Sequence, residues 1–283
     1  RLSAMGDVAM TVPVLRALAH HFPELKLTVI SRPFFKPFFK DIPNLHFFAF
    51  DEKARHKGIL GLWRLYQDLK ALNIDAFADL HNVLRSKVVR SLFALSGKKI
   101  AFVDKGRAEK KALTRAENKS FQPLTTMFER HQLVFETLGF PIDLSRPQFP
   151  AKAEISQPEL TAIVSQSQKL IGIAPFAQYD SKVYPLDLMQ EVIDALAHHK
   201  EHTVLLFGGG QNEKEQLDNL KRDKNNVINM AGKVPFTAEF DLISNLDVML
   251  SMDSGNGHIA AMLGVPVVTL WGATHPYAGF LPF

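Results

Sequence analysis

The residues best suited to chemistry form the segment 251–261, Ser-Met-Asp-Ser-Gly-Asn-Gly-His-Ile-Ala-Ala. It follows the apolar stretch Val248–Leu250 and precedes a helical pattern, which predicts a turn from a strand into a helix. Small residues at such a turn let backbone N–H groups point at an anion, which the helix dipole also favours. We therefore predict a phosphate site at Ser254–Gly257, with Asp253 accepting hydrogen bonds from sugar hydroxyls. The alternative is that Asp253 or Ser254 only caps the helix.

A second candidate is Asp7, in the segment Ser3-Ala4-Met5-Gly6-Asp7. Gly6 permits a tight turn, and Asp7 would then begin the following helix at the carboxyl edge of a sheet. A carboxylate in that place could take a proton from a hydroxyl group as it attacks a donor. Simple capping of the helix by Asp7 is an equally good interpretation of these residues.

Two further charged residues follow predicted strands in the second half of the chain. Lys182 lies in a loop after the strand Leu170–Ala174, where a cation could neutralise the charge of a departing diphosphate. A solvated loop lysine is the alternative. Glu213 follows Gly208–Gly210, whose glycines would allow close approach of a ligand. Because this segment is not G-x-G-x-x-G, it does not support a dinucleotide fingerprint.

Polar and aromatic groups also occur in the first half. The segment 79–86, Asp-Leu-His-Asn-Val-Leu-Arg-Ser, follows a predicted strand and could bind a second substrate through His81 and Arg85. A capped helix with a surface arginine explains it nearly as well. The segment Arg32–Lys40 has four phenylalanines among basic residues. It could dip into a membrane interface, or it could be a helix packed through its phenylalanines.

The elements that would position these residues alternate between extended and helical patterns, which predicts mostly parallel sheets covered by helices. The stretch Asp104–Lys119 is polar and basic and predicts a loop or an exposed, mobile helix. Four prolines in the segment 141–158 indicate an interdomain linker. We therefore predict two Rossmann-like domains, 1–155 and 156–283. The expected strands are Leu25–Ile30, Leu45–Phe50, Ala76–Leu80, Lys99–Val103, Leu170–Ala174, Thr203–Phe207, Val227–Asn229, Val248–Met252 and Val265–Trp271.

Composition narrows the class of protein. The 283 residues contain no cysteine, which excludes disulfides and fits a reducing compartment, and no D-x-D run suggests a metal site. No apolar run approaches the roughly 20 residues that span a bilayer, and no secretory signal is evident. We expect neither end of the sequence to be a natural boundary.

Charge is unevenly distributed along the chain. Residues 1–155 carry 25 Lys and Arg against 15 Asp and Glu, a net charge of +10. Residues 156–283 carry 8 against 14, a net charge of −6. The first half is therefore expected to meet an anionic partner, and nucleic acid, anionic lipid and a phosphorylated sugar all satisfy this condition.

Taken together, these segments resemble glycosyltransferase family 9, the lipopolysaccharide heptosyltransferases, along essentially the whole chain. The resemblance is carried by the segments 1–7 with Pro13, 79–86, 182–185 (Lys-Val-Tyr-Pro), 253–261, 263–266 and 270–276. It implies an α/β GT-B fold, in which two Rossmann-like domains face a cleft. It also implies an inverting sugar transfer that needs no metal or other cofactor. The second domain would bind the nucleotide-sugar donor and the first would bind the acceptor.

The resemblance further implies roles for individual residues. Asp7 would be the general base and Lys182 would contact donor phosphate. The implied donor is an ADP-sugar, and the implied acceptor is an anionic lipid-linked sugar of the lipopolysaccharide core, with no nucleic acid involved. The enzyme would be cytoplasmic, with a peripheral contact to the inner membrane. The remaining predicted site residues are Asp253, Ser254, Gly255, Gly257, His258 and Glu213 for the donor, and Arg85, His81, Lys110 and Lys111 for the acceptor.

Two positions depart from the family pattern. Tyr184 stands where tryptophan is usual, and His81-Asn82 replaces a pair that contains glutamine. The second departure falls on the acceptor side. Three alternatives stay open from sequence alone: a different nucleotide-sugar donor, a Rossmann oxidoreductase, and a binding protein that has kept the fold without the chemistry.

Overall fold

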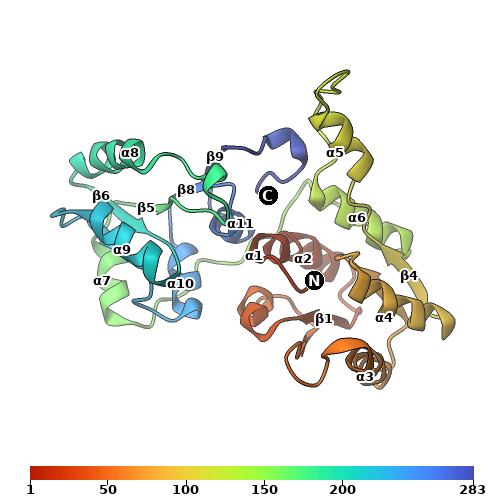
Figure 1. Cartoon of the computed structure of the whole chain (residues 1–283). Coiled ribbons are helices and arrows are strands. Elements are labelled where there is room, and N and C mark those ends of the chain that lie inside the picture. Colours follow the sequence, from red (N-terminus) through yellow and green to blue (C-terminus); the bar gives the residue numbers. More distant parts are fainter. The chain divides into compact units, whose positions relative to one another are not determined.

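The computed structural model describes residues 1–283, which divide into two compact units (Figure 1). The first unit comprises Arg1–Gln148 with Tyr277–Leu281, and the second comprises Phe149–Pro276 with Pro282–Phe283. The break at Gln148 lies in the proline-rich segment 141–158, where the prediction placed the linker. The return of residues 277–281 to the first unit has no counterpart in the prediction, which divided the chain at a single point.

The first unit is built on two parallel strand pairs. Strand β1 (Leu27–Ser31) pairs with β2 (Leu45–Ala49), and β3 (Ala76–Asp79) pairs with β4 (Lys99–Phe102). The main chain of Arg1 lies beside β1, because its nitrogen donates to the Ile30 carbonyl at 3.1 Å. The helices are α1 (Met5–Ala9), α2 (Val12–His21), α3 (Gly58–Lys70), α4 (Leu84–Leu95), α5 (Arg107–Thr114) and α6 (Met127–Thr137).

The aromatic segment 32–40 belongs to the interior of this unit. It forms the 3₁₀ helix η1 (Pro33–Phe39), in which Phe35, Phe38 and Phe39 are buried and only Phe34 is exposed. The interpretation as a helix packed through its phenylalanines is therefore confirmed. The membrane-interface interpretation of this segment is wrong, since three of its four apolar rings have no access to solvent.

The basic stretch Asp104–Lys119 contains an ordered element. Residues 107–114 form α5, which begins at Gly106 and buries Leu113. Arg130 of α6 ties this region down, because its guanidinium contacts Glu109 and donates to the Thr125 carbonyl. Gly106 has a φ of 60°, a left-handed conformation that favours glycine, and a Cβ there would meet the end of the Arg130 side chain.

The second unit contains one parallel sheet in the order β7-β6-β5-β8-β9. Strands β6 and β7 lie on one side of β5, and β8 and β9 lie on the other, so the strand order reverses between β5 and β8. The strands are β5 (Lys169–Ala174), β6 (His202–Leu206), β7 (Val227–Asn229), β8 (Val248–Met252) and β9 (Val267–Leu270). The helices are α7 (Pro158–Gln166), α8 (Leu186–His198), α9 (Gly210–Lys221), α10 (Phe236–Ile243) and α11 (Gly255–Met262), with the short 3₁₀ helices η2 (Asp180–Lys182) and η3 (Pro276–Ala278, which crosses into the first unit).

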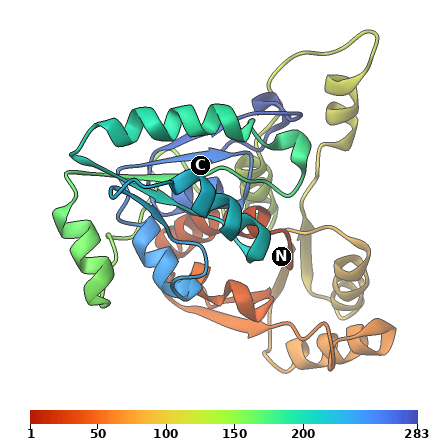
Figure 2. The same cartoon turned by 60° about the vertical axis from the view of Figure 1, so that its left-hand side comes forward.

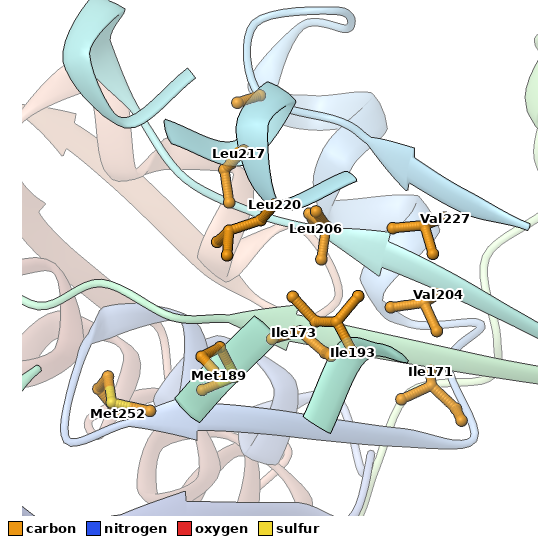
Figure 3. Close-up of a cluster of buried hydrophobic side chains, with 11 residues drawn as sticks. Ile171, Ile173, Met189, Ile193, Val204, Leu206, Leu217, Leu220, Val227 and Met252 are labelled. Carbon is orange, nitrogen blue, oxygen red and sulfur yellow. The ribbon is translucent and has the colours of Figure 1, made fainter. Parts of the chain in front are cut away.

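A continuous apolar cluster holds this sheet to its helices (Figure 3). Ile171, Ile173 and Val204 on the central strands pack against Met189 and Ile193 of α8, and all five are buried. Strands buried in this way are typical of a parallel sheet covered by helices. The rigid core fixes the carboxyl ends of β5, β6 and β8, from which the loops of the candidate site emerge. No helix of the chain combines the length and the apolar character that crossing a bilayer requires.

Candidate active site

The centre of the site in the second unit is an ion pair between Lys182 and Asp253. The Lys182 Nζ lies 2.6 Å from Asp253 Oδ2, and the Thr274 hydroxyl donates to the same oxygen at 2.8 Å. Lys182 follows β5 and Asp253 follows β8, the two strands between which the sheet order reverses. Ligands of open α/β sheets bind outside the carboxyl ends of strands at such a switch point. The structure therefore brings together two residues 71 positions apart that the sequence predicted as site residues.

The N-terminus of α11 lies next to this pair. Ser254 occupies the N-cap position but makes no side-chain capping hydrogen bond, and Asp253 is engaged with Lys182 and Thr274 instead. Ser254 is thus the N-cap residue, as the alternative interpretation held, but neither Ser254 nor Asp253 makes a side-chain capping hydrogen bond. The first backbone N–H groups of α11 carry no side-chain cap, and this is the condition under which a helix N-terminus binds an anion.

The turn residues of this segment differ in exposure. Ser254 and Gly255 are partly exposed, whereas Gly257 and His258 are buried. A Cβ on Gly257 would lie 3.0 Å from the Ser251 hydroxyl, so glycine lets α11 pack closely on β8. Gly257 and His258 therefore belong to the buried side of the turn, whereas Ser254 and Gly255 are the residues that a ligand can reach.

The loop after β9 contributes residues to which the sequence assigned no role. Gly272 packs directly on the Lys182 loop: a Cβ there would lie 2.5 Å from the Ser181 carbonyl oxygen. The same carbonyl accepts the Ala273 N–H at 2.8 Å. This close contact holds Thr274 where it can bond Asp253. The position of Gly272-Ala273-Thr274 directly after the last predicted strand was the available signal.

Glu213 lies in the first turn of α9, the helix that follows β6. Its Oε2 accepts the Gly209 N–H at 2.7 Å, which folds the carboxylate back over the glycine turn at the start of α9. The other carboxylate oxygen, Oε1, takes no part in that bond. Glu213, Lys182 and Asp253 thus follow three adjacent strands of one sheet, and all face the same carboxyl edge.

The first unit has a separate group of functional residues around Asp7. The Asp7 carboxylate contacts the Arg1 guanidinium through Oδ2, and the same oxygen accepts the Ala4 N–H at 3.1 Å. Asp7 therefore does cap its helix, as one interpretation proposed. None of these contacts uses Oδ1, and the side chain keeps 29% of its exposure. The cap and an oxygen able to accept a proton coexist in one carboxylate.

Arg1 connects Asp7 to the end of β3. Its guanidinium donates to the Leu80 carbonyl at 2.9 Å while it pairs with Asp7. The turn that follows is held by Asp79, which is buried and accepts the N–H groups of His81 and Asn82 at 3.0 and 2.7 Å. Arg90 of α4 donates to the other oxygen of Asp79 at 3.0 Å. The segment 79–86 is thus a rigid turn that presents His81 beside the Arg1–Asp7 pair.

His81 is neutral at physiological pH. Burial, followed by the positive charge of Arg1, lowers the pKa of its imidazole to about 4. Its Nδ1 is buried without a hydrogen-bond partner within the protein. A neutral imidazole with one unsatisfied nitrogen is suited to hydrogen bonding with a hydroxyl-bearing ligand.

Basic residues of the segment 105–111 complete this region. Burial lowers the pKa of both Lys105 and Lys110, and in each case the carboxylate of Asp7 opposes that shift, so both amines lie within the field of Asp7. Lys110 rests over the Phe280 ring at 4.0 Å and is half-buried, whereas Lys111 is exposed. The prediction treated these two lysines as a pair, and the structure separates them.

A cavity of about 210 Å³ lies against the same segment. Its lining includes Asn82, Lys87, Lys105 and Arg107. Lys105 was not singled out from the sequence, although it follows β4 directly, at the sheet edge where ligand-binding residues are expected. Arg85 lies further from it: its guanidinium is 3.6 Å from Glu52 and stacks over Phe50 at 5.2 Å.

No group of three or more potential metal-ligating side chains occurs together in residues 1–283.

Comparison with known proteins places the chain in a family. A family model described as glycosyltransferase family 9 (heptosyltransferase) matches residues 62–279. The lipopolysaccharide core heptosyltransferase OpsX of Haemophilus influenzae is 27% identical over 282 residues, with 98% of this chain and 78% of that protein covered. Lipopolysaccharide heptosyltransferase 3 of Escherichia coli is 26% identical over 283 residues, with 95% and 80% covered.

Solved structures resemble the fold of this chain. The glycosyl transferase family 9 structure from Veillonella parvula matches with a TM-score of 0.78 and 20% identity, over 100% of this chain and 83% of the other. The ADP-heptose lps heptosyltransferase II of E. coli matches with a TM-score of 0.69 and 23% identity, over 97% and 84%. Together with the parallel sheets of both units, these matches define an α/β protein of the GT-B class.

Because the family model covers well over half of the chain, this chain belongs to glycosyltransferase family 9, the heptosyltransferase family. It is accordingly a glycosyltransferase, as the sequence resemblance implied.

Proposed function

We propose that this enzyme transfers a heptose, with inversion, from an ADP-sugar to an anionic lipid-linked sugar of the lipopolysaccharide core. The second unit would bind the donor and the first unit would bind the acceptor. The observation that carries the proposal is the Lys182–Asp253 pair beside the uncapped N-terminus of α11. This arrangement offers one ammonium and several N–H groups to a diphosphate, together with a carboxylate for sugar hydroxyls.

The proposed reaction is a single displacement in which Asp7 is the general base. Asp7 Oδ1 takes the proton of the attacking acceptor hydroxyl, and that oxygen forms a bond to the anomeric carbon of the donor sugar. The bond from this carbon to the diphosphate oxygen breaks, and ADP departs with the electron pair. Since one displacement occurs at that carbon, its configuration inverts. Lys182 and the N–H groups of α11 would stabilise the charge that develops on the diphosphate.

The step as proposed requires no metal or other cofactor, because Lys182 supplies the positive charge that a divalent cation would otherwise provide. Lys182 is already directed at the switch point by its bond to Asp253, and the Gly272 loop holds it in place. A cation fixed before the reaction stabilises the transition state without the cost of reorganisation. Glu213 would reach the donor from the end of β6, through its Oε1.

The acceptor is proposed from the chemistry of the first unit. Residues 1–155 carry a net charge of +10, and Lys105, Lys110 and Arg1 surround Asp7. Such a cation-rich site would favour a substrate with carboxylate or phosphate groups. His81 and Arg85 would contact the acceptor sugar. The enzyme would act at the cytoplasmic face of the inner membrane.

The test combines titration calorimetry with amide hydrogen exchange. ADP-heptose, UDP- and GDP-sugars and NAD are titrated separately into the full chain. Amide hydrogen exchange of the protein is then mapped in its complex with the ligand that binds most tightly. We expect the ADP-sugar to bind best and to protect the loops at residues 182 and 253–257. Preference for NAD, or protection confined to residues 1–148, would refute the donor assignment.

A further inference from the structure

Two neighbouring helices of the first unit expose large apolar side chains to solvent. On α3, Ile59 is 84% exposed, Leu60 75% and Trp63 50%. On α4, Leu84 is 80% exposed, Leu95 87% and Val88 38%. Single exposed apolar residues are common on soluble proteins, but a group of six on two adjacent helices marks an interaction surface. We call these six residues the α3–α4 face.

The two helices lie side by side, as Figures 1 and 2 both show. Their contact is made by Tyr66 of α3 and Phe93 of α4, whose ring centroids are 4.9 Å apart. Trp63 lies against the same Tyr66 at 5.4 Å, which places it at the border with α4. On α4, positions 84, 88 and 95 recur at helical spacing and share one side of the helix. The exposed side chains therefore flank one helix–helix contact.

The helices that carry this face have a net positive charge. Helix α4 contains Arg85, Lys87 and Arg90 and no acidic residue, although Arg85 pairs with Glu52 and Arg90 with Asp79. Helix α3 contains Arg64 and Lys70 with a single acidic residue, Asp68, which is bonded to Arg55 and His56. The apolar side chains are thus set among cations, with the nearest helical carboxylate already neutralised.

This combination selects one occupant. A second copy of the chain on the same face would bring the cations of both copies together, which opposes self-association. A bilayer with anionic headgroups accepts both features: tryptophan and aliphatic side chains enter the interface, and lysine and arginine pair with the headgroups. We propose that the α3–α4 face docks this enzyme onto an anionic lipid surface. This proposal rests on the proposed function in one respect: a lipid-linked acceptor resides in a bilayer, so the enzyme must reach a membrane surface.

The test is cosedimentation of the full chain with vesicles. One set contains phosphatidylethanolamine and phosphatidylglycerol, and the other contains phosphatidylcholine alone. We expect the protein to bind the anionic vesicles, to release as salt is raised, and to bind the zwitterionic vesicles weakly. The triple variant Ile59→Ser, Trp63→Ser, Leu84→Ser should lose about tenfold or more in partitioning, because it removes most of the insertable area. The variant Arg64→Gln, Lys70→Gln should lose the preference for anionic lipid.

The matched control is Leu133→Ser with Leu188→Ser, which removes two exposed leucines from other helices, α6 and α8. It should bind vesicles as the parent does. Equal binding by the triple variant and the parent, or failure of the parent to bind anionic vesicles, would overturn the proposal. Sedimentation equilibrium that showed a parent dimer dissociated by the triple substitution would also overturn it, in favour of a self-interface. These vesicles contain neither donor nor acceptor, so the outcome is independent of the donor titrations.

Discussion

The two units use a carboxylate beside a helix start in opposite ways. In the first unit, Asp7 bonds the Ala4 N–H and so caps α1 itself. In the second, Asp253 bonds Lys182 and Thr274 and leaves the N-terminus of α11 without a side-chain cap. A helix whose N–H groups are satisfied by its own side chain has less to offer an anion than one left open. We therefore expect anion binding by a helix terminus at α11 and not at α1.

The units also differ in how they would attract an anionic ligand. Residues 1–155 are strongly basic, so an anion feels their summed field at a distance. Residues 156–283 are acidic overall, and an anion must there be bound by local groups, namely Lys182 and backbone N–H groups. Salt screens summed fields between exposed charges far more than it screens contacts in a partly buried site. The two proposed substrates should therefore respond differently to ionic strength.

The largest effect is expected at Asp7, the proposed general base of the first unit. Asp7→Asn keeps the size of the side chain and an oxygen for the Ala4 N–H but removes the proton acceptor. Turnover should fall by roughly 100-fold or more, with donor affinity nearly unchanged. Steady-state kinetics and calorimetry with ADP measure the two quantities.

The control is Glu129→Gln on α6. Glu129 caps its helix as Asp7 does, by accepting the Thr126 N–H at 2.7 Å. This variant should lose about 1 kcal/mol or less of stability and keep its turnover. If Asp7→Asn behaves like Glu129→Gln, Asp7 is only a helix cap and the proposed mechanism is wrong.

The next effect is expected at Lys182. Lys182→Gln removes the ammonium that the second unit would use against the diphosphate. A charge-assisted hydrogen bond is worth about 1.5–3 kcal/mol, so the dissociation constant for ADP should rise by about 10- to 100-fold. Lys169→Gln is the matched control, because Lys169 also pairs with an aspartate, Asp247 at 3.6 Å, but at the other end of β5. Weakening by both variants alike would point to lost stability instead of a lost ligand contact.

A smaller effect is expected from the basic segment of the first unit. Reversal of Lys110 and Lys111 to Glu should weaken apparent acceptor affinity severalfold, more at low salt than at high salt, and should leave donor affinity unchanged. The structure sharpens this expectation. Lys111→Glu alone should weaken acceptor affinity only through the long-range electrostatic field, so its effect should disappear at high salt. Lys110→Glu should retain an effect at high salt, because Lys110 is half-buried on Phe280 within the field of Asp7. If the double variant and the parent have equal acceptor kinetics at low salt, the segment does not contribute to acceptor binding and is only a solvated surface.

Local patterns were sufficient to predict much of this molecule. Strand β8 was predicted with its observed limits, and so was the turn at Asp253 that follows it, because apolar runs and glycine turns are written in consecutive residues. The sheet edge that unites Lys182, Glu213 and Asp253 followed from the rule that parallel strands end together. The break between the two units falls in the segment 141–158, where prolines interrupt the periodic patterns of the sequence.

What could not be predicted depends on contacts between distant residues. Helix α5 is held in place by Arg130, and this contact could not be predicted from a segment in which the only pattern is a high density of charge. The role of Gly272 becomes evident only when its loop is seen packed on Ser181, 91 positions earlier in the chain. The phenylalanines of η1 and the leucines of α4 look equally apolar in sequence. The structure shows that most of the η1 phenylalanines are buried and that Leu84 and Leu95 of α4 are exposed. The candidate membrane surface is therefore the α3–α4 face and not the segment 32–40.

The last expected effect concerns stability, and the direction of its response to pH differs between the two units. In the first unit, burial lowers the pKa of His81 to about 4 and that of His131 to about 3. Both are neutral when folded, so they reduce stability as pH falls below their unfolded pKa of about 6.5. In the second unit, burial raises the pKa of Glu239 from 4.5 to about 7. Below pH 4.5 this carboxyl is protonated in both states and costs nothing.

Between pH 4.5 and 7 the unfolded chain loses the Glu239 proton while the folded chain retains it, so the free energy of unfolding falls as pH rises. Above pH 7 the loss is complete and constant. Glu239→Gln should therefore stabilise the protein at pH 8 by about 1 to 3 kcal/mol and change little at pH 4. Thermal unfolding across this range measures the difference, with Glu191→Gln on the exposed side of α8 as the control for charge removal. A gain from Glu239→Gln that is equal at pH 4 and pH 8 would show that the raised pKa is not its source. Confinement of the gain to the alkaline side would establish that the second unit loses stability as pH rises, whereas the histidines of the first unit lose it as pH falls.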